Sequence, residues 1–461
     1  MKLRLSSPRH ARHSTLCLLV ASLVLFVVNS GDRQQHVVAQ SRQQSRQQSR
    51  QGVPLAAERV NLTTPSEVGL EIDARAPAAS WAKAGAEAAA LTISVDGQYN
   101  QDLILWVGDR DYTYRVTLGR LPRGPHKIAV RLNEPRSAPG ARRAQIKALR
   151  TIVAAPNAGA DADDALALAY SPILYARANT IDRFTDLPVL MYYEIESEPS
   201  GDKLIRYSTI FTHEDGGTPA AALMSRWGRM TDIEWTYELR LRGRRIVAET
   251  FQGIEHETKD FRGERALGSH PLLATASDNN NFSDLASSVV RFAPLPTRVR
   301  LDASSREIIM DERPEIYRVM AEELQREKRI AETPSGVNVI ADPRRYLYLE
   351  GYAEQQATTV AFEVQQKQNL LSSDHGDPRL RIERSGYFRS TILLPAGANV
   401  DRISLRCYAR TGGAPGGSCH KVKLNKAFFL NDEYTPQPLK FEASPEKSLA
   451  PGQAATYRIN K

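Results

Sequence analysis

The sequence predicts a mainly β protein of tandem antiparallel β-sandwich domains with one substantial connecting helix. Short runs that alternate apolar and polar residues, separated by turn residues, fill residues 54–155 and recur in residues 337–461. Such runs at regular spacing are typical of β-sandwiches. Helical periodicity is strong only between residues 304 and 332. A chain of 461 residues also exceeds what one hydrophobic core usually serves, so we expect several domains.

The composition is that of an ordinary globular protein, with 41% hydrophobic and 25% charged residues. The net charge of +8 lies mostly at the N-terminus, because residues 1–53 hold eight lysine and arginine residues against Asp32 alone and therefore carry +7. Residues 54–461 carry only +1. A nucleic-acid surface needs a basic face that neutralises phosphates, so we expect no nucleic-acid partner.

Residues 1–30 have the pattern of a signal peptide. A basic stretch runs through His13, and an apolar stretch over residues 16–28 is shorter than the ~20 residues that a membrane span needs. Cleavage after Ser30 and cleavage after Ala39 both fit, and a retained N-terminal anchor is the alternative. We therefore expect a secreted or periplasmic protein with no membrane span after cleavage.

Residues 31–53 are predicted to form a disordered linker. Gln-Ser-Arg-Gln occurs three times in succession over residues 40–51. This stretch has no apolar side chain to bury, so nothing offsets its chain entropy.

Residues 54–155 are predicted to form an N-terminal β-sandwich. An Asp96-Gly97 turn, a following strand and the turn from Leu121 to His126 (Leu-Pro-Arg-Gly-Pro-His) carry this pattern. The pattern loosely resembles the accessory carbohydrate-binding modules of secreted carbohydrate-active proteins. Trp106 and Tyr112 are candidate platforms for stacking a sugar ring, and burial in the core is the alternative role for such aromatics.

Residues 165–302 are predicted to form a central β domain, which a linker over residues 154–164 precedes and a strand over residues 166–175 opens. Three segments occur in order: Tyr-Ser-Pro-Ile-Leu-Tyr at 170–175, Gly-Arg-Met-Thr-Asp-Ile-Glu-Trp at 228–235 and His-Pro-Leu-Leu-Ala-Thr-Ala at 270–276. They resemble the landmarks of the Vps62-related family, which has a His-Glu-Gly-Asp-Trp-Glu motif in its central segment. Arg229 and Met230 stand where that motif has His-Glu, and Ile233 stands where it has Trp. The family has no settled activity, so the resemblance implies a fold more than a function.

The strand expected at residues 232–239 carries the main candidate site. Alternation puts Asp232, Glu234, Thr236 and Glu238 on one face and Ile233, Trp235, Tyr237 and Leu239 on the other. Acidic residues two apart can share a cation or act as an acid–base pair. The candidate catalytic residues are Asp232, Glu234, His213 and His270; the candidate metal ligands are Asp232, Glu234, His213, His256 and Asp278. A half-buried strand with a solvated acidic face is the alternative, and Trp235 is a third candidate for ligand stacking.

Residues 303–335 are predicted to form the connecting helix, with Pro314 near its start and Ile316, Val319, Met320, Leu324 and Ile330 on one apolar face. Residues 337–461 follow as a C-terminal β-rich domain. Cys407 and Cys419 are the only cysteines beyond the leader, and in an oxidising compartment we expect them to form a disulfide. Two unrelated thiols are the alternative.

Two function classes follow from these patterns. The first is a secreted multidomain β protein that binds an extracellular or cell-envelope polymer, with a polysaccharide as the expected partner. The second is a metal-assisted hydrolase centred on residues 232–238. The cofactor stays unknown from the sequence; a divalent metal ion is the candidate, and whether one is bound stays open.

Overall fold

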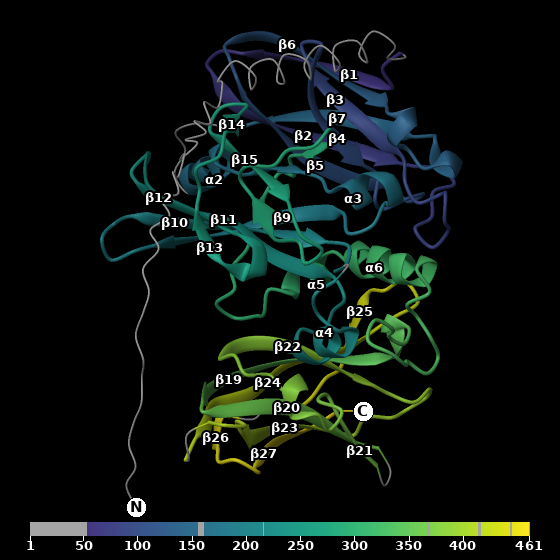
Figure 1. Cartoon of the computed structure of the whole chain (residues 1–461), viewed down its shortest axis with the longest axis vertical. Coiled ribbons are helices and arrows are strands. Elements are labelled where there is room, and N and C mark those ends of the chain that lie inside the picture. The colour runs from purple at the N-terminus through teal and green to yellow at the C-terminus, as the bar shows by residue number, and fades with distance from the viewer. Residues whose placement is uncertain are drawn as a thin grey trace, which may run out of the picture. The chain divides into compact units, whose positions relative to one another are not determined.

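The computed structural model describes residues 53–154, 161–214, 216–366, 369–413, 416–442 and 445–460 (Figure 1). The predicted leader and all of the predicted linker except Val53 lie outside these residues. Within them, no helix combines the length and the apolar character that crossing a membrane requires. The predicted fold class is confirmed, because antiparallel sheets dominate and helices are few and short.

Two sheets of the first sandwich are formed by residues 56–153. The first has the strand order β1-β6-β3-β4 and the second the order β5-β2-β7. Asp96 and Gly97, at φ 51° and 78°, make the tight turn that joins two strands of the first sheet, as the Asp-Gly pair predicts. The strands are β1 (Ala56–Leu62), β2 (Ser66–Arg75), β3 (Ala90–Val95), β4 (Gln98–Ile104), β5 (Tyr112–Leu121), β6 (Gly124–Leu132) and β7 (Gln145–Val153).

The central region also contains two sheets, with the orders β13-β12-β11-β10-β9-β18 and β14-β15-β8-β17, and β16 pairs with β15. Two strand pairs are parallel, β8 with β15 and β9 with β18, so this region is not purely antiparallel. The strands are β8 (Ile173–Tyr175), β9 (Pro188–Ser197), β10 (Lys203–Phe211), β11 (Asp232–Arg242), β12 (Arg245–Gln252), β13 (Thr258–Asp260), β14 (Arg265–Ala266), β15 (His270–Thr275), β16 (Phe282–Ser283), β17 (Arg291–Phe292) and β18 (Thr297–Arg298).

One element of this region differs from its prediction. Residues 161–169 form helix α2 (Asp161–Ala169), where the sequence suggested a linker running into a strand. Alanine and leucine are the best helix formers, and acidic residues in the first turn favour a helix N-terminus. Only residues 173–175 of the expected strand are extended.

Four further helices lie in the central part of the chain: α3 (Ala178–Arg183), α4 (Ala220–Arg226), α5 (Ile308–Glu312) and α6 (Glu315–Arg326). Helix α6 begins directly after Pro314 and buries Ile316, Val319, Met320 and Leu324, as its periodicity predicts. The predicted range of 303–335 is too long, because α6 ends at Arg326, Ile330 lies beyond it and a break separates it from α5. Short 3-10 helices occur at Glu134–Arg136 (η1), Pro139–Ala141 (η2), Ile254–His256 (η3), Pro343–Arg345 (η4) and Pro378–Leu380 (η5).

The last two sheets form the C-terminal sandwich, with the orders β22-β19-β24-β25 and β21-β20-β23-β27; β26 pairs with β24. The strands are β19 (Tyr346–Gln356), β20 (Thr358–Gln366), β21 (Asn369–Ser372), β22 (Gly386–Leu393), β23 (Arg402–Ala409), β24 (Ser418–Leu430), β25 (Pro436–Pro438), β26 (Lys447–Leu449) and β27 (Ala454–Arg458).

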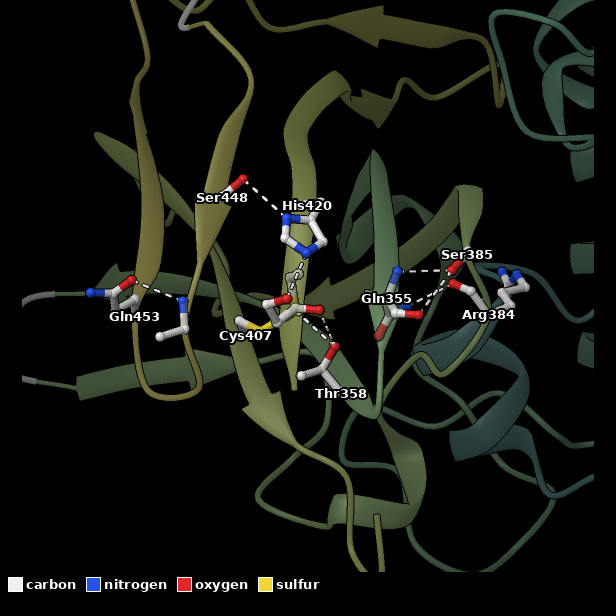
Figure 2. The surroundings of a disulfide bond; sticks show 11 residues. Gln355, Thr358, Arg384, Ser385, Cys407, His420, Ser448 and Gln453 are labelled. Atoms are coloured by element: carbon white, nitrogen blue, oxygen red, sulfur yellow. Dashed lines mark hydrogen bonds between the residues drawn. A yellow bond between two sulfur atoms is a disulfide. The ribbon is translucent and has the colours of Figure 1, made fainter. Parts of the chain in front are cut away.

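A disulfide joins Cys407 on β23 to Cys419 on β24, with an S–S distance of 2.09 Å, and so links the two sheets of this sandwich (Figure 2). Both cysteines are fully buried. Beside them His420 bonds to Ser418 and Ser448 at 2.6 and 3.2 Å.

The apolar core crosses the borders between the predicted domains. One cluster of buried side chains extends from Leu62 in the first sandwich through the central sheet and α6 to Phe428 and Leu430 in the last sandwich. A backbone hydrogen bond also joins the first sandwich to the central region, because Thr117 N on the edge strand β5 donates to Ala293 O at 2.8 Å. A second cluster fills the C-terminal sandwich, and a third fills the central region between its own two sheets.

Candidate functional site

Strand β11 carries Asp232 and Glu234 on one face of the central sheet. Asp232 lies opposite Phe211 and Glu234 opposite Thr209, and directly opposed residues of an antiparallel pair project to the same side. Thr236 shares this side, because its hydroxyl bonds to that of Thr209 at 2.7 Å. These three positions agree with the predicted alternation.

A register shift after Trp235 changes the face of the residues that follow. Tyr237 lies opposite Tyr207, on the side of Asp232, whereas the sequence placed it on the other side. Glu238 lies opposite Arg206 and bonds to it at 2.7 Å, away from Asp232. The predicted row of four residues is therefore wrong at Glu238, because one bulged residue inverts the alternation.

Three carboxyl groups gather where β10 ends and β11 begins: Glu214, Asp232 and Glu234, called the acidic centre below. Glu214 and Asp232 are buried, and the side chain of Glu234 is 12% exposed. Burial and the charge of Asp232 raise the pKa of Glu214 to about 7. The same two causes raise the pKa of Glu234 to about 8. Both groups therefore hold a proton for much of the time at neutral pH, as a general acid requires.

Asn280 connects the acidic centre to a second buried carboxylate. Its side-chain NH₂ donates to Asp232 Oδ2 at 2.9 Å and to Asp186 Oδ1 at 2.7 Å. Arg177 in turn bonds to Asp186 at 2.7 Å and also pairs with Asp278. Asp278 therefore joins the centre indirectly, through Arg177, Asp186 and Asn280. Asn280 Oδ1 is buried and accepts no hydrogen bond from the residues that the structure describes.

His256 lies at the open side of the acidic centre. Its side chain is half exposed, and its Nδ1 is 3.7 Å from Glu234 Oε2. Asn279 Nδ2 lies 2.8 Å from His256 Nε2. Glu255 and His256 both have a φ near +60°, a strained backbone that is common at functional sites. The predicted neighbours Asp232, Glu234 and His256 thus do lie together.

His213 belongs to an adjoining cluster with helix α6. It is fully buried, and its Nε2 lies 3.0 Å from Glu327 and 3.7 Å from Glu323. Burial opposes a charge on the ring, but the two glutamates outweigh it and raise the pKa of His213 to about 9. Against the same burial, the bond from His213 lowers the pKa of Glu327 to about 2. Glu323 also accepts from Asp186 N at 3.0 Å, which links this cluster to Asn280.

The ligand atoms of His213, Glu323 and Glu327 lie within 4.8 Å of one another, a spacing that a metal ion could use. Arg326 and Arg329, however, lie 3.6 Å from Glu323 and Glu327 respectively. With His213 protonated, the two carboxylates already face three cationic groups. Arg326 and Arg329 already pair with the two carboxylates, so these contacts fit an ion-paired cluster better than a metal centre.

His270 lies apart from the candidates above. It is buried on β15, where Nδ1 bonds to Ser171 O at 2.8 Å and Nε2 to Glu67 at 3.2 Å. Glu67 comes from the first sandwich. These partners give His270 a role in joining two regions of the fold, and the structure does not bring it to the acidic centre.

A separate open cleft of about 770 Å³ contains the other predicted residues, Trp106 and Tyr112. Trp106 is buried beneath Tyr112 and Tyr114, with ring centroids 5.1 and 6.3 Å apart, and Tyr112 is half-buried. The walls come from β4, β5 and the start of β9. Charged side chains of both signs line the cleft: Asp73, Asp111, Arg115, Lys147, Glu312, Arg313 and Glu315. Trp235 is not among the lining residues; it is half-buried opposite Ser208.

Several site residues lay beyond the sequence candidates: Glu214, Asn280, Asp186, Glu323 and Glu327. Glu323 did leave a signal, because it stands on the apolar face of the predicted helix, four residues after Val319 and three after Met320. Asp186 left none, since only the fold brings it into contact with Asn280, 94 positions away.

Comparisons with known proteins add little to this geometry. No family model matches the chain, and no curated protein matches it. A solved structure described as the EclA C-terminal domain, a sugar-binding protein, is similar over 22% of this chain and 66% of its own, with 17% identity and a TM-score of 0.18. A TM-score this low supports no inference about fold or ligand.

Proposed function

We propose that this chain is a secreted multidomain β protein that binds an extracellular or cell-envelope carbohydrate in the cleft beside Trp106 and Tyr112. The cleft carries the proposal. Its volume of about 770 Å³ lies within the usual range for ligand sites, and its wall has an aromatic cluster. The apolar face of a sugar ring stacks on such rings, while its hydroxyl groups bond to planar carboxylate and guanidinium groups.

The charges of the cleft favour a neutral polymer. Lys147 bonds to Asp111 at 2.5 Å, Arg115 to Glu71 at 2.9 Å, and Asp73 accepts from Arg150 outside the cleft at 2.8 Å. Because these charges are paired, the cleft has no strong electrostatic field of one sign. We therefore expect it to prefer ligands rich in hydrogen-bonding groups over ligands with a net charge.

Secretion and the family of the central region remain parts of the proposal. The N-terminal pattern supports export, and a buried disulfide suits an oxidising compartment. The Vps62-related resemblance rests on the motifs at residues 170–175, 228–235 and 270–276 alone.

Binding of soluble oligosaccharides by the full chain, measured by calorimetry, tests the proposal. Tyr112→Ala removes the more accessible ring of the cleft and is expected to weaken binding about tenfold, which corresponds to the loss of one stacking contact of ~1.4 kcal/mol. Tyr387→Ala is the matched control, since Tyr387 is a partly exposed tyrosine on β22 of the last sandwich. Equal affinities of wild type and Tyr112→Ala across a panel of neutral glycans would contradict the proposal.

A second candidate function is hydrolysis at the acidic centre. The raised pKa values of Glu214 and Glu234 favour it, because perturbed carboxyl groups of this kind are common in catalytic acids. Asp232→Asn and Glu234→Gln should abolish any release of reducing ends from polysaccharide. Metal analysis of the purified protein tests whether a divalent ion assists: stoichiometric metal that is lost in Asp232→Asn would favour the metal-assisted form.

A further inference from the structure

A group of arginines surrounds Trp227 at the end of helix α4. The guanidinium carbon of Arg226 lies 4.9 Å from the ring centre of Trp227, and that of Arg384 lies 5.5 Å from it. Arg384 Nη2 also donates to Arg226 O at 2.6 Å and so closes the C-terminus of α4. All three side chains are partly exposed. Two cationic groups from segments 158 residues apart thus share one aromatic ring.

Glu307, whose negative charge acts on Arg384, already has other arginine partners. Glu307 is buried and accepts from Arg229 Nε at 3.2 Å, and Arg306 Nε lies 3.9 Å away. Neighbouring Arg389 has its own partners, since it pairs with Asp311 at 2.5 Å and Glu350 at 2.9 Å. Among the residues that the structure describes, no carboxylate oxygen lies within 4.0 Å of a nitrogen of Arg226 or Arg384.

Two observations indicate that the cationic charge here is in excess. Arg226 Nε is buried and has no hydrogen-bond partner in the described part of the chain. Burial lowers the pKa of Arg384 to about 10; Glu307 opposes this, whereas Arg306, Arg229 and Arg226 act in the same direction as burial. Like charges held close together without counter-charges cost free energy, which a bound anion would recover.

We propose that Arg226 and Arg384 bind an anionic group, a sulfate, phosphate or carboxylate, against Trp227. The guanidinium fork matches such oxyanions with two parallel hydrogen bonds. The ring of Trp227 holds the guanidinium groups of Arg226 and Arg384 in place, which reduces the side-chain entropy lost when an anion binds. The site is independent of the carbohydrate cleft, because none of its residues lines that cleft.

Titration of the full chain with sodium sulfate or sodium phosphate, at constant ionic strength kept with chloride, tests this site. Tryptophan fluorescence and the thermal midpoint are the two readouts. The wild type should give a saturating change in both. Arg226→Gln should weaken binding at least about tenfold, as the loss of one charge-assisted contact predicts. In the described part of the chain Arg226 Nε donates no hydrogen bond, so folding is expected to survive the change.

Two further variants sharpen the result. Arg410→Gln is the matched control, because Arg410 is exposed and pairs with Glu383 at 2.7 Å; it should bind like the wild type. Trp227→Phe should lose the fluorescence change and retain the shift in thermal midpoint. An anion response that does not saturate, or that is equal in wild type and Arg226→Gln, would overturn the proposal.

The source of the anion is tested by comparing a sulfated or uronic-acid polymer with inorganic sulfate at equal anion concentration. Tighter binding of the polymer, lost in Arg226→Gln, assigns the site to a polymer-borne group. Equal affinities for the polymer and for inorganic sulfate assign the site to a free oxyanion. Both results support the presence of an anion site.

Discussion

At the scale of single residues, the acidic centre holds groups that work against stability. Glu234 is nearly buried beside Asp232, and its pKa of about 8 lies far above the ordinary value of 4.5. A carboxyl group whose pKa is raised by folding costs free energy once the pH exceeds its unfolded value, and the cost is complete above its folded value. Proteins retain such costs mainly where a site needs them.

Glu234→Gln is therefore expected to stabilise the protein at high pH. The variant should match the wild type near pH 4 and exceed it by about 1–3 kcal/mol above pH 8, because glutamine need not ionise. Urea unfolding at several pH values measures this difference. Glu238→Gln on the same strand is the control: its carboxylate is paired with Arg206, and losing an accessible pair should cost at most about 1 kcal/mol. A Glu234→Gln variant less stable than wild type at pH 8 would show that the ionised form is well compensated.

The shifted pKa of His213 stabilises the folded protein, whereas that of Glu234 destabilises it. Its raised pKa of about 9 makes a stabilising contribution that is complete below pH 6.5 and disappears as the pH rises through 9. Glu327, with its pKa lowered to about 2, contributes above pH 4.5 and loses that contribution as the pH falls to 2. His213→Gln should thus be about 2–4 kcal/mol less stable than wild type near pH 5.5, with a smaller gap at pH 2.5 and at pH 9.5.

Chemical unfolding across this pH range tests the expectation for His213. His420→Gln is the comparison, because His420 is exposed and bonds to Ser418 and Ser448, away from any buried carboxylate pair described above. A gap for His213→Gln that stays constant from pH 2.5 to 9.5 would mean that packing, and not charge, accounts for the role of His213.

At the scale of elements, the sequence was informative wherever local pattern decides structure. Alternation located β11 to within a few residues, and periodicity with Pro314 located α6. Residues 161–169 were misjudged because short polar-apolar runs rich in alanine fit a linker as well as a helix. The candidate site was predicted less well from the sequence. Strand β11 was found, but the register shift after Trp235 depends on the pairing of β11 with β10, and the pattern of a single strand does not contain that information.

The disulfide between β23 and β24 supplies a prediction at this scale. Replacing both Cys407 and Cys419 by alanine should lower the free energy of unfolding by about 2–4 kcal/mol, because the cross-link closes a loop of about a dozen residues and joins the two sheets. Unfolding in urea measures the loss. The wild type in reductant should show the same loss, and a double variant as stable as the oxidised wild type would contradict the argument.

At the scale of the whole molecule, the distribution of the core matters most. The largest apolar cluster joins the first sandwich, the central sheets, α6 and the inner strands of the last sandwich. A buried polar link accompanies it, since Arg389 on β22 bonds to Asp311 of α5 and to Glu350 on β19. Residues that share one core lose their packing together, so these regions should unfold in one transition.

The positions of the tryptophans make this cooperativity measurable. Trp81, Trp106, Trp227 and Trp235 all precede the last sandwich, so fluorescence reports on the first and central regions while far-UV circular dichroism reports on every strand. The two signals should coincide in urea for the wild type. Arg389→Met removes one side of the buried link. It takes the arginine partner from Glu350 and leaves Asp311 with Lys426 at 3.6 Å, at an expected cost of about 3–5 kcal/mol. In that variant the fluorescence and dichroism curves should separate, because the last sandwich keeps its own core and disulfide. Separate transitions already in the wild type would mean that the shared cluster is too weak to couple the regions.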